Sequence, residues 1–120
     1  NVIRLPKTQN VNSSSLARLQ MMMQYIHSNY SENISLLEIA RAGKVSISTA
    51  LNLFRNVLDT SPVNYLICYR LKKAALLLTN TEKKISAIST ETGFNNTDYF
   101  CKTFKRIYSL TPTEYRNIKK

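Results

Sequence analysis

The sequence contains few of the residues that interrupt helices. Only 2 glycines and 3 prolines occur among 120 residues, and no stretch alternates β-branched with polar residues as a strand does. The single histidine, His27, has no carboxylate or nucleophile at a catalytic spacing. These absences favour an all-α fold and weigh against an enzyme.

Cysteine is also scarce. Cys68 and Cys101 lie far apart in the sequence, and neither belongs to a Cys/His pair with the spacing of zinc ligands. We therefore predict no metal site and no cofactor, and we expect a reduced, cytoplasmic protein. A redox-sensing role for Cys101 is conceivable, but a small side chain without that role is the simpler interpretation.

Acidic residues are outnumbered by basic ones, and long apolar runs are missing. The chain has 7 Asp and Glu residues against 17 Lys and Arg residues, a formal net charge of +10. This surplus favours a polyanionic partner, either nucleic acid or an anionic membrane surface. No apolar run is long enough to cross a bilayer, and no secretory signal pattern occurs. The basic residues are scattered around helices that need their apolar faces for a core, which disfavours the membrane surface.

What the sequence does contain is an internal repeat. Residues 53–55, 60–62 and 65 match residues 103–105, 110–112 and 115 at an offset of 50 (104 minus 54). Upstream, Ile39-Ala40 matches Ile88-Ser89 at an offset of 49 (88 minus 39), so the second copy has gained one residue. Two copies are too few for a solenoid, which needs at least about three repeats. We expect each copy to form the same supersecondary unit.

Apolar periodicity and capping residues place the helices. We expect them at about 14–30, from 35, at 47–58, at 62–78, from 84, at 97–108 and from 111. The predicted N-terminal caps are Ser35 with Glu38 and Thr111 with Glu114 as capping boxes, Ser46, Asn95 or Asn96, and Ser61 followed by Pro62. Tight turns at Gly43–Val45 and Gly93-Phe94 separate a short helix from a second helix in each copy. The helix-turn-helix plan therefore occurs twice.

Helical wheels at about 100° per residue separate inward from outward positions in the second helix of each copy. In 47–58 the apolar face holds Ala50, Leu53, Phe54 and Val57, and the opposite face holds Ser48, Asn52 and Arg55. In 97–107 the apolar face holds Phe100, Phe104 and Ile107, and the opposite face holds Asp98, Lys102 and Lys105. The outward positions correspond at an offset of 50 (102 minus 52).

The outward side chains suit contacts with DNA. Asn can pair with adenine, Lys can donate to guanine, Asp can accept from cytosine, and Leu51, on the flank, can touch a thymine methyl group. Positions at the helix ends suit phosphate, which fixes register without reading sequence; they are Ser46, Arg55, Asn96, Lys105 and Arg106. Any surface helix has a polar outward face, and only the position in the second helix of a helix-turn-helix favours base reading.

Residues from Leu16 to Arg116 resemble the AraC/XylS family of bacterial transcription regulators. The similarity is strongest over 93–106, which looks like the family's signature. The residues that carry it are Gly93-Phe94, Tyr99-Phe100 and Phe104-Lys105, followed by Thr111-Pro112 and Tyr115-Arg116. The stretch 65–78 resembles the family's linking helix.

The resemblance implies a seven-helix domain, with two helix-turn-helix subdomains joined by a long helix at about 62–78. Its two recognition helices would enter successive major-groove segments about 34 Å apart and read a bipartite, nonpalindromic site. Family members mostly activate transcription by contacting RNA polymerase, and many carry an N-terminal effector-sensing or dimerisation domain. The base-contacting positions implied are Ser48, Leu51, Asn52, Thr97, Asp98, Cys101 and Lys102.

Four positions depart from the family pattern. Asp59 and Ser109 replace glycines before the Ser/Thr-Pro pairs, where Asp tolerates a left-handed backbone better than Ser does. Lys44 stands at the usual turn glycine of the first copy, and Ser89 replaces a small Ala where two helices cross. The first recognition helix also lacks a large Arg or Trp, so we expect it to read fewer bases or to rely on DNA shape.

We therefore expect a tail at 1–13, a first subdomain at 14–61, a linking helix at 62–80 and a second subdomain at 81–120. The expected partner is double-stranded DNA in the bacterial cytoplasm and nucleoid, and the full-length protein is expected to carry a further N-terminal domain. The alternative is a basic helical module that binds an acidic protein without reading DNA sequence.

Overall fold

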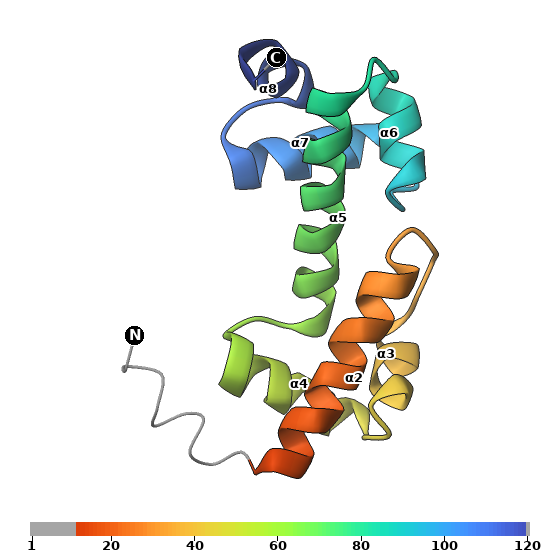
Figure 1. Ribbon diagram of the computed structural model, residues 1–120, viewed down its shortest axis with the longest axis vertical. Helices are drawn as coiled ribbons and strands as arrows, with labels where there is room; N and C mark the ends of the chain where they lie inside the picture. Colours follow the sequence, from red (N-terminus) through yellow and green to blue (C-terminus); the bar gives the residue numbers. More distant parts are fainter. Residues whose placement is uncertain (1–11, 120) are drawn as a thin grey trace. The chain divides into compact units, whose positions relative to one another are not determined.

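The computed structural model describes residues 12–119 and contains helices and no strand over that range. Of the tail expected at 1–13, only Asn12 and Ser13 lie within the described residues. Seven α-helices follow one another (Figure 1), which confirms the predicted all-α class. They are α2 (Ser13–Asn29), α3 (Leu36–Ala42), α4 (Ile47–Leu53), α5 (Pro62–Asn80), α6 (Ile85–Glu91), α7 (Thr97–Tyr108) and α8 (Pro112–Lys119). Over residues 12–119 no helix combines the length and apolarity that crossing a membrane requires.

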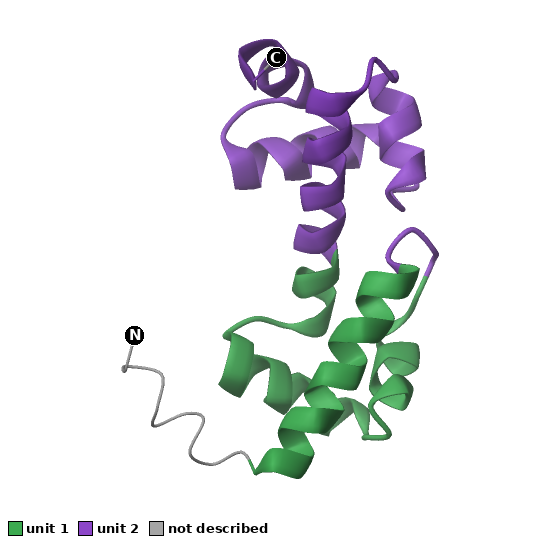
Figure 2. Ribbon diagram, in the orientation of Figure 1, with its two compact units in different colours: residues 1–29, 34–66 green, residues 30–33, 67–120 purple. Residues whose placement is uncertain are grey.

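The chain divides into two compact units. Within the described residues, unit 1 comprises 12–29 and 34–66, and unit 2 comprises 30–33 and 67–119. The boundary falls inside α5, whose first residues belong to unit 1 and whose remainder belongs to unit 2 (Figure 2). The segment 30–33 stands between α2 and α3 in the sequence but belongs to unit 2.

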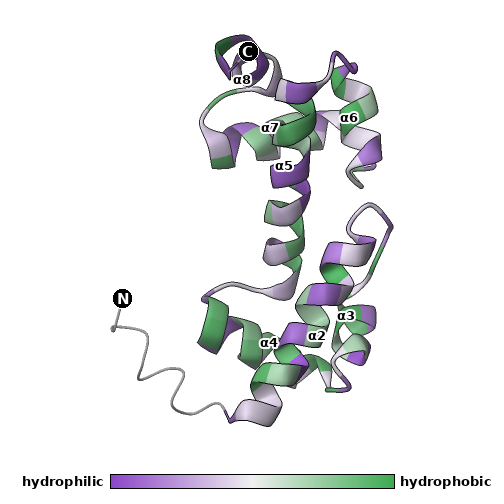
Figure 3. Ribbon diagram, in the orientation of Figure 1, coloured by the Kyte–Doolittle hydropathy of each residue, from purple (hydrophilic) through white to green (hydrophobic). Residues whose placement is uncertain are grey.

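Unit 1 has an aliphatic core. Leu19, Met22 and Ile26 are spaced three and four apart along α2, so they share one buried face. That face meets buried residues of the next two helices, which are Ile39 and Ala40 of α3 and Ala50 and Leu53 of α4. Hydrophobic and hydrophilic residues both occur on each of these helices (Figure 3), as amphipathic helices around a core require.

Unit 2 has an aromatic core. The buried residues are Leu71, Ala74, Ala75 and Leu78 of α5, Ile88 of α6, Phe94, and Phe100 and Phe104 of α7. The ring of Phe104 stacks on Tyr108 with centroids 4.4 Å apart and meets Tyr115 edge-on at 5.3 Å. Such aromatic pairs contribute about 0.5–1.5 kcal/mol beyond the area that they bury. They fix α7 and α8 to each other.

The first helix of each unit occupies an equivalent place in the repeat. The three buried residues of α2 correspond to Leu71, Ala74 and Leu78 of α5 at an offset of 52 (71 minus 19). The repeat therefore extends upstream of the matches visible in the sequence. Unit 2 uses the second part of α5 as its own first helix.

One wheel prediction is wrong, and one helix differs in form from the expectation. The helix expected at 47–58 is α-helical to Leu53 and continues to Leu58 as a π-helical turn, η2 (Phe54–Leu58). The wider turn keeps Phe54 buried, with its ring 5.7 Å from that of Tyr65, before the chain reverses at a left-handed Asp59. In α7, Ile107 was expected inward but is 45% exposed, because the buried face follows Phe100, Thr103 and Phe104 instead.

Candidate nucleic-acid interface

The turn before α4 is tightly built. Gly43 ends α3, and a Cβ added to it would lie 2.6 Å from Cγ of Met22, so only glycine fits. Lys44 follows in the left-handed region at φ 59°. The Val45 N–H donates to the Ala40 carbonyl at 3.1 Å and closes the turn. The backbone therefore accepts a lysine at the position where the family pattern has glycine.

The N-terminus of α4 is capped as predicted. Ser46 Oγ accepts a hydrogen bond from the Thr49 N–H at 3.1 Å and donates one to Thr49 Oγ1, also at 3.1 Å. The capping box of α3 is confirmed too, since the Ser35 and Glu38 side chains each accept from the other's backbone N–H. Both helices of this helix-turn-helix therefore begin at the residues that the sequence indicates.

The turn before α7 contains the extra residue of the second copy. Gly93 adopts φ 97°, and the Phe94 N–H donates to the Ser89 carbonyl at 2.9 Å, which repeats the closing bond of the first turn. Asn96 Oδ1 then accepts from the Tyr99 N–H at 2.9 Å. Asn96, not Asn95, is therefore the cap, and the added residue lies between Phe94 and Asn96.

On α4, the side chains expected to face DNA are accessible to different degrees. Ser48 and Asn52 are exposed one turn apart, and Leu51 between them is half-buried. Ala50 and Leu53 are buried against the core on the opposite face. The outer face of α4 is thus small, polar and uncharged.

On α7, the outer face carries charge. Asp98 and Lys102 are exposed and stand four residues apart, while Thr97 and Cys101 are half-buried beside them. Burial raises the pKa of the Cys101 thiol, and the Asp98 carboxylate raises it further. A thiol with a raised pKa holds little thiolate and reacts slowly, which favours a packing role for Cys101 over redox sensing.

The residues expected at phosphate are all exposed. Lys105 and Arg106 lie in the last turn of α7, and Arg55 lies in η2. Arg55 is exposed, as the wheel predicted, although it lies in the π-helical turn and not in α4. The oxygens of Ser46 and Asn96 already serve as caps of their own helices.

Sequence reasoning missed two arginines that lie against the two turns, Arg18 and Arg70. Arg18 of α2 donates to the carbonyls of Gly43 and Lys44, and Arg70 of α5 lies against Gly93. Their positions differ by 52 (70 minus 18), the offset that relates the two first helices. Extending the repeat upstream of Ile39 would have found them. Among residues 12–119, no three His, Cys, Asp or Glu side chains gather as metal ligands.

Comparison with known proteins places this geometry in a family. A family model described as a helix-turn-helix domain matches residues 39–118. An uncharacterized HTH-type transcriptional regulator, YdeC, of Bacillus subtilis (strain 168) is 36% identical over 101 residues, covering 84% of this chain and 35% of the relative. The lactose operon transcription activator of Staphylococcus xylosus is 30% identical over 99 residues, covering 82% of this chain and 36% of the relative. The chain thus spans about a third of the length of these curated relatives.

A solved structure matches the fold over most of the chain. It is a transcriptional regulator with an AraC-type DNA-binding domain from Chromobacterium violaceum, superimposing with a TM-score of 0.83 at 30% sequence identity. The match covers 90% of this chain and 96% of that one. The family consists of DNA-binding regulators and not of enzymes. The chain therefore belongs to the AraC/XylS family of helix-turn-helix transcription regulators and corresponds to its C-terminal DNA-binding domain.

Proposed function

We propose that this domain reads a bipartite double-stranded DNA site, one half-site through α4 and the other through α7. One observation carries the proposal. Exposed hydrogen-bonding side chains recur at the same positions of both second helices, as Ser48 with Asp98 and Asn52 with Lys102. They lie on the second helix of each helix-turn-helix, which is the helix that enters the major groove.

The half-site bound by α7 is read mainly by charged groups. Lys102 donates to guanine O6 or N7, and Asp98 accepts from the cytosine amino group. Thr97 and Cys101, half-buried at the edge of this face, contact base edges or the thymine methyl group.

The half-site bound by α4 is read by neutral groups. Asn52 pairs with adenine N6 and N7, Leu51 contacts a thymine methyl group, and Ser48 donates or accepts at either base. These side chains carry no charge, so this half contributes less electrostatic attraction. Sequence-dependent shape of the DNA supplements its readout.

Phosphate contacts hold both helices in register. Arg55, Lys105 and Arg106 supply the charges, and the capped helix ends at Ser46 and Asn96 supply backbone amides. These contacts are independent of sequence, so they raise the affinity for all DNA alike.

The domain works within a larger protein. We place the two reading subdomains at 14–61 and 81–120 and the linking helix at 62–80. The full-length protein activates transcription through RNA polymerase on the bacterial nucleoid, with an effector-sensing or dimerisation domain on the N-terminal side. The activator name of the Staphylococcus xylosus relative and the greater length of the relatives support this part of the proposal.

The test begins with selection of bound DNA from a random pool, followed by gel shifts of the selected site at graded salt. We expect an enriched site with two separated conserved segments, and an affinity that falls steeply as salt rises. If no sequence is enriched and all DNA binds alike, the proposal is wrong. Binding to acidic proteins in place of DNA would then favour the helical interaction module.

A further inference from the structure

We infer that Arg18 and Arg70 are paired positioning residues, each holding the turn that sets the recognition helix of its own unit. This inference rests on the proposed function, because it assigns a role in base reading to two residues that are not among the proposed DNA contacts. Arg18 would serve α4, and Arg70 would serve α7.

In unit 1 the arginine binds the turn directly. Nη1 of Arg18 donates to the Gly43 carbonyl at 3.3 Å and to the Lys44 carbonyl at 3.2 Å. Lys44 adopts the left-handed backbone that lysine disfavours. The charged donor therefore stabilises a strained turn three residues before the first residue of α4.

The same turn has no room to shift toward α2. A Cβ on Gly43 would meet the Arg18 carbonyl at 2.9 Å and Met22 at 2.6 Å. Arg18 thus contacts the turn both through its side chain and through its backbone carbonyl. Both contacts join α2 to the turn that precedes α4.

In unit 2 the arginine acts through a short segment of chain. Nε of Arg70 donates to the Tyr30 carbonyl at 2.7 Å, and Nη2 donates to the Glu32 carbonyl at 2.8 Å. The rings of Tyr30 and Tyr69 meet edge-on at 5.3 Å. The ammonium of Lys73 lies 5.3 Å from the centre of the Tyr69 ring. These contacts attach the segment 30–33 to unit 2.

The segment 30–33 and Arg70 both pack closely against the turn before α7. A Cβ on Gly93 would lie 2.6 Å from the Tyr30 carbonyl oxygen and 2.7 Å from Nε of Arg70. Burial lowers the pKa of Arg70, but an arginine stays charged in proteins. The half-buried guanidinium therefore needs the two carbonyls to satisfy its donors. The turn is thereby packed against a charged group that two carbonyls hold in place.

Base reading is sensitive to such support. Hydrogen bonds to base edges require the side chain to be placed within roughly 0.5 Å, so an element that sets the helix affects specificity without touching DNA. Arg18 and Arg70 are half-buried and donate to backbone carbonyls. They therefore differ from arginines that neutralise phosphate, and the two roles leave different signatures in binding.

The experiment measures base preference position by position. A site is selected with the unsubstituted domain, and its halves are assigned through Asn52→Ala for α4 and Lys102→Ala for α7. A panel of single base changes is then titrated with Arg18→Ala and Arg70→Ala. In Arg70→Ala we expect the affinity ratio between the selected site and its single-base changes to fall about tenfold in the α7 half. The same ratio in the α4 half should stay within about twofold of its value in the unsubstituted domain. Arg18→Ala should show the reverse.

The two variants serve as controls for each other, and salt dependence excludes a phosphate role. A positioning arginine leaves the slope of affinity against salt unchanged, whereas loss of a phosphate contact lowers it by about 1. Lys72→Ala, an exposed neighbour of Arg70, controls for charge on α5. If an alanine variant fails to fold, Arg18→Lys and Arg70→Lys keep the charge but lose the fork of donors, and the same half-site loss is expected.

Three outcomes overturn the inference. Equal loss in both halves would indicate general destabilisation, a reduced salt slope would indicate phosphate contact, and unchanged preference would show that the arginines are dispensable for reading. Absence of any preference in the unsubstituted domain would overturn the proposed function, and the inference with it. A normal preference there, combined with any of the three outcomes, would overturn the inference alone.

Discussion

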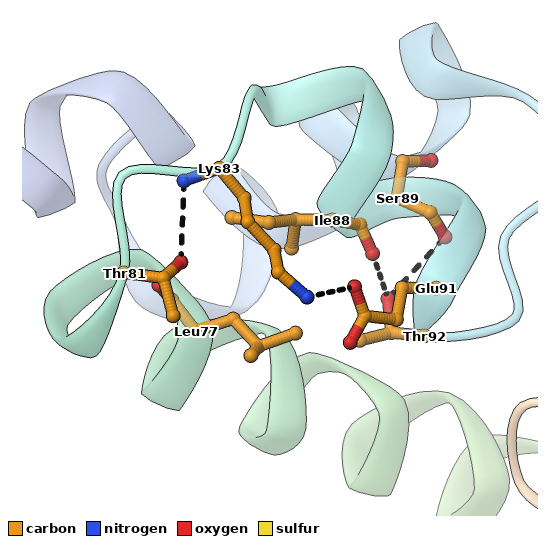
Figure 4. Close-up of polar contacts among 7 residues, drawn as sticks. All are labelled: Leu77, Thr81, Lys83, Ile88, Ser89, Glu91 and Thr92. Carbon is orange, nitrogen blue, oxygen red and sulfur yellow. Dashed lines mark hydrogen bonds and ion pairs between the residues drawn. The ribbon is translucent and has the colours of Figure 1, made fainter.

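Two equivalent residues, Ala40 and Ser89, lie on α3 and α6, the first helix of each helix-turn-helix, and both are fully buried. The Ser89 hydroxyl has no hydrogen-bond partner among the described residues. The backbone carbonyl of Ser89 accepts from the hydroxyl of Thr92 at 3.3 Å (Figure 4) and from the Phe94 N–H at 2.9 Å, so this carbonyl is satisfied. A buried polar atom without a partner costs stability, and the equivalent buried residue of unit 1 is the apolar Ala40.

The first prediction follows from this difference. Ser89→Ala should raise the free energy of unfolding by about 1–3 kcal/mol, because it removes a desolvated hydroxyl and leaves the packing intact. Ala40→Ser is the matched control and should lower it by a similar amount. Urea denaturation monitored by circular dichroism measures both. A destabilised Ser89→Ala variant would mean that the hydroxyl makes a contact of its own.

The second prediction concerns left-handed residues that end helices. Asp59 and Ser109 adopt φ 58° and 67° after η2 and α7. A left-handed non-glycine residue costs about 1–2 kcal/mol, and Asp tolerates it better than Ser. Ser109→Gly should therefore raise the melting temperature more than Asp59→Gly does. Equal gains would contradict the role given to the Asp side chain.

At the level of elements, most helix ends could be predicted from the sequence, whereas the turns could be predicted only in part. Caps depend on residues within three positions, so Ser35, Ser46 and Thr111 could be read from the sequence. The choice between Asn95 and Asn96 and the π-helical form of η2 depend on how the helix meets the core. The bonds of Arg18 and Arg70 join residues 25 to 40 positions apart, which local periodicity does not address. The all-α fold could be predicted from the sequence, whereas the hydrogen bonds of these two arginines could not.

The third prediction concerns the capping box of α8. The Thr111 N–H donates to Glu114 at 2.9 Å, and this bond holds the pKa of Glu114 below its ordinary value. A lowered folded-state pKa stabilises the fold fully above the ordinary glutamate pKa, and that contribution is lost as pH falls through the lowered pKa. Glu114→Gln should therefore be less stable than the unsubstituted domain at neutral pH, with the difference shrinking on acidification. A difference independent of pH, in unfolding measured across that range, would contradict this assignment.

At the level of the whole molecule, the two units differ in what they present to DNA. The outer face of α4 is neutral, whereas α7 carries Asp98 and Lys102 on its outer face and Lys105 and Arg106 in its last turn. The chain has a formal net charge of +10, so nonspecific attraction to DNA is expected in any case. Sequence preference is what separates the regulator from a generally basic domain.

The fourth prediction separates base contacts from phosphate contacts within α7. Lys102→Ala should cost about 1–3 kcal/mol on the selected site and relax preference at a single position. Lys105→Ala should weaken binding to all sequences alike and lower the salt slope by about 1. Titration of both variants against the selected site and its single-base changes distinguishes them. Identical behaviour would mean that the two residues are assigned wrongly.

Sequence-specific DNA binding is tested most directly by competition at physiological salt. The labelled selected site is bound by the unsubstituted domain and displaced either by the same site or by a scrambled duplex of identical composition. We predict that the scrambled duplex competes about a thousandfold less well. Equal competition by the two duplexes at every salt concentration would contradict the account, because it would leave only the attraction of a basic protein for DNA.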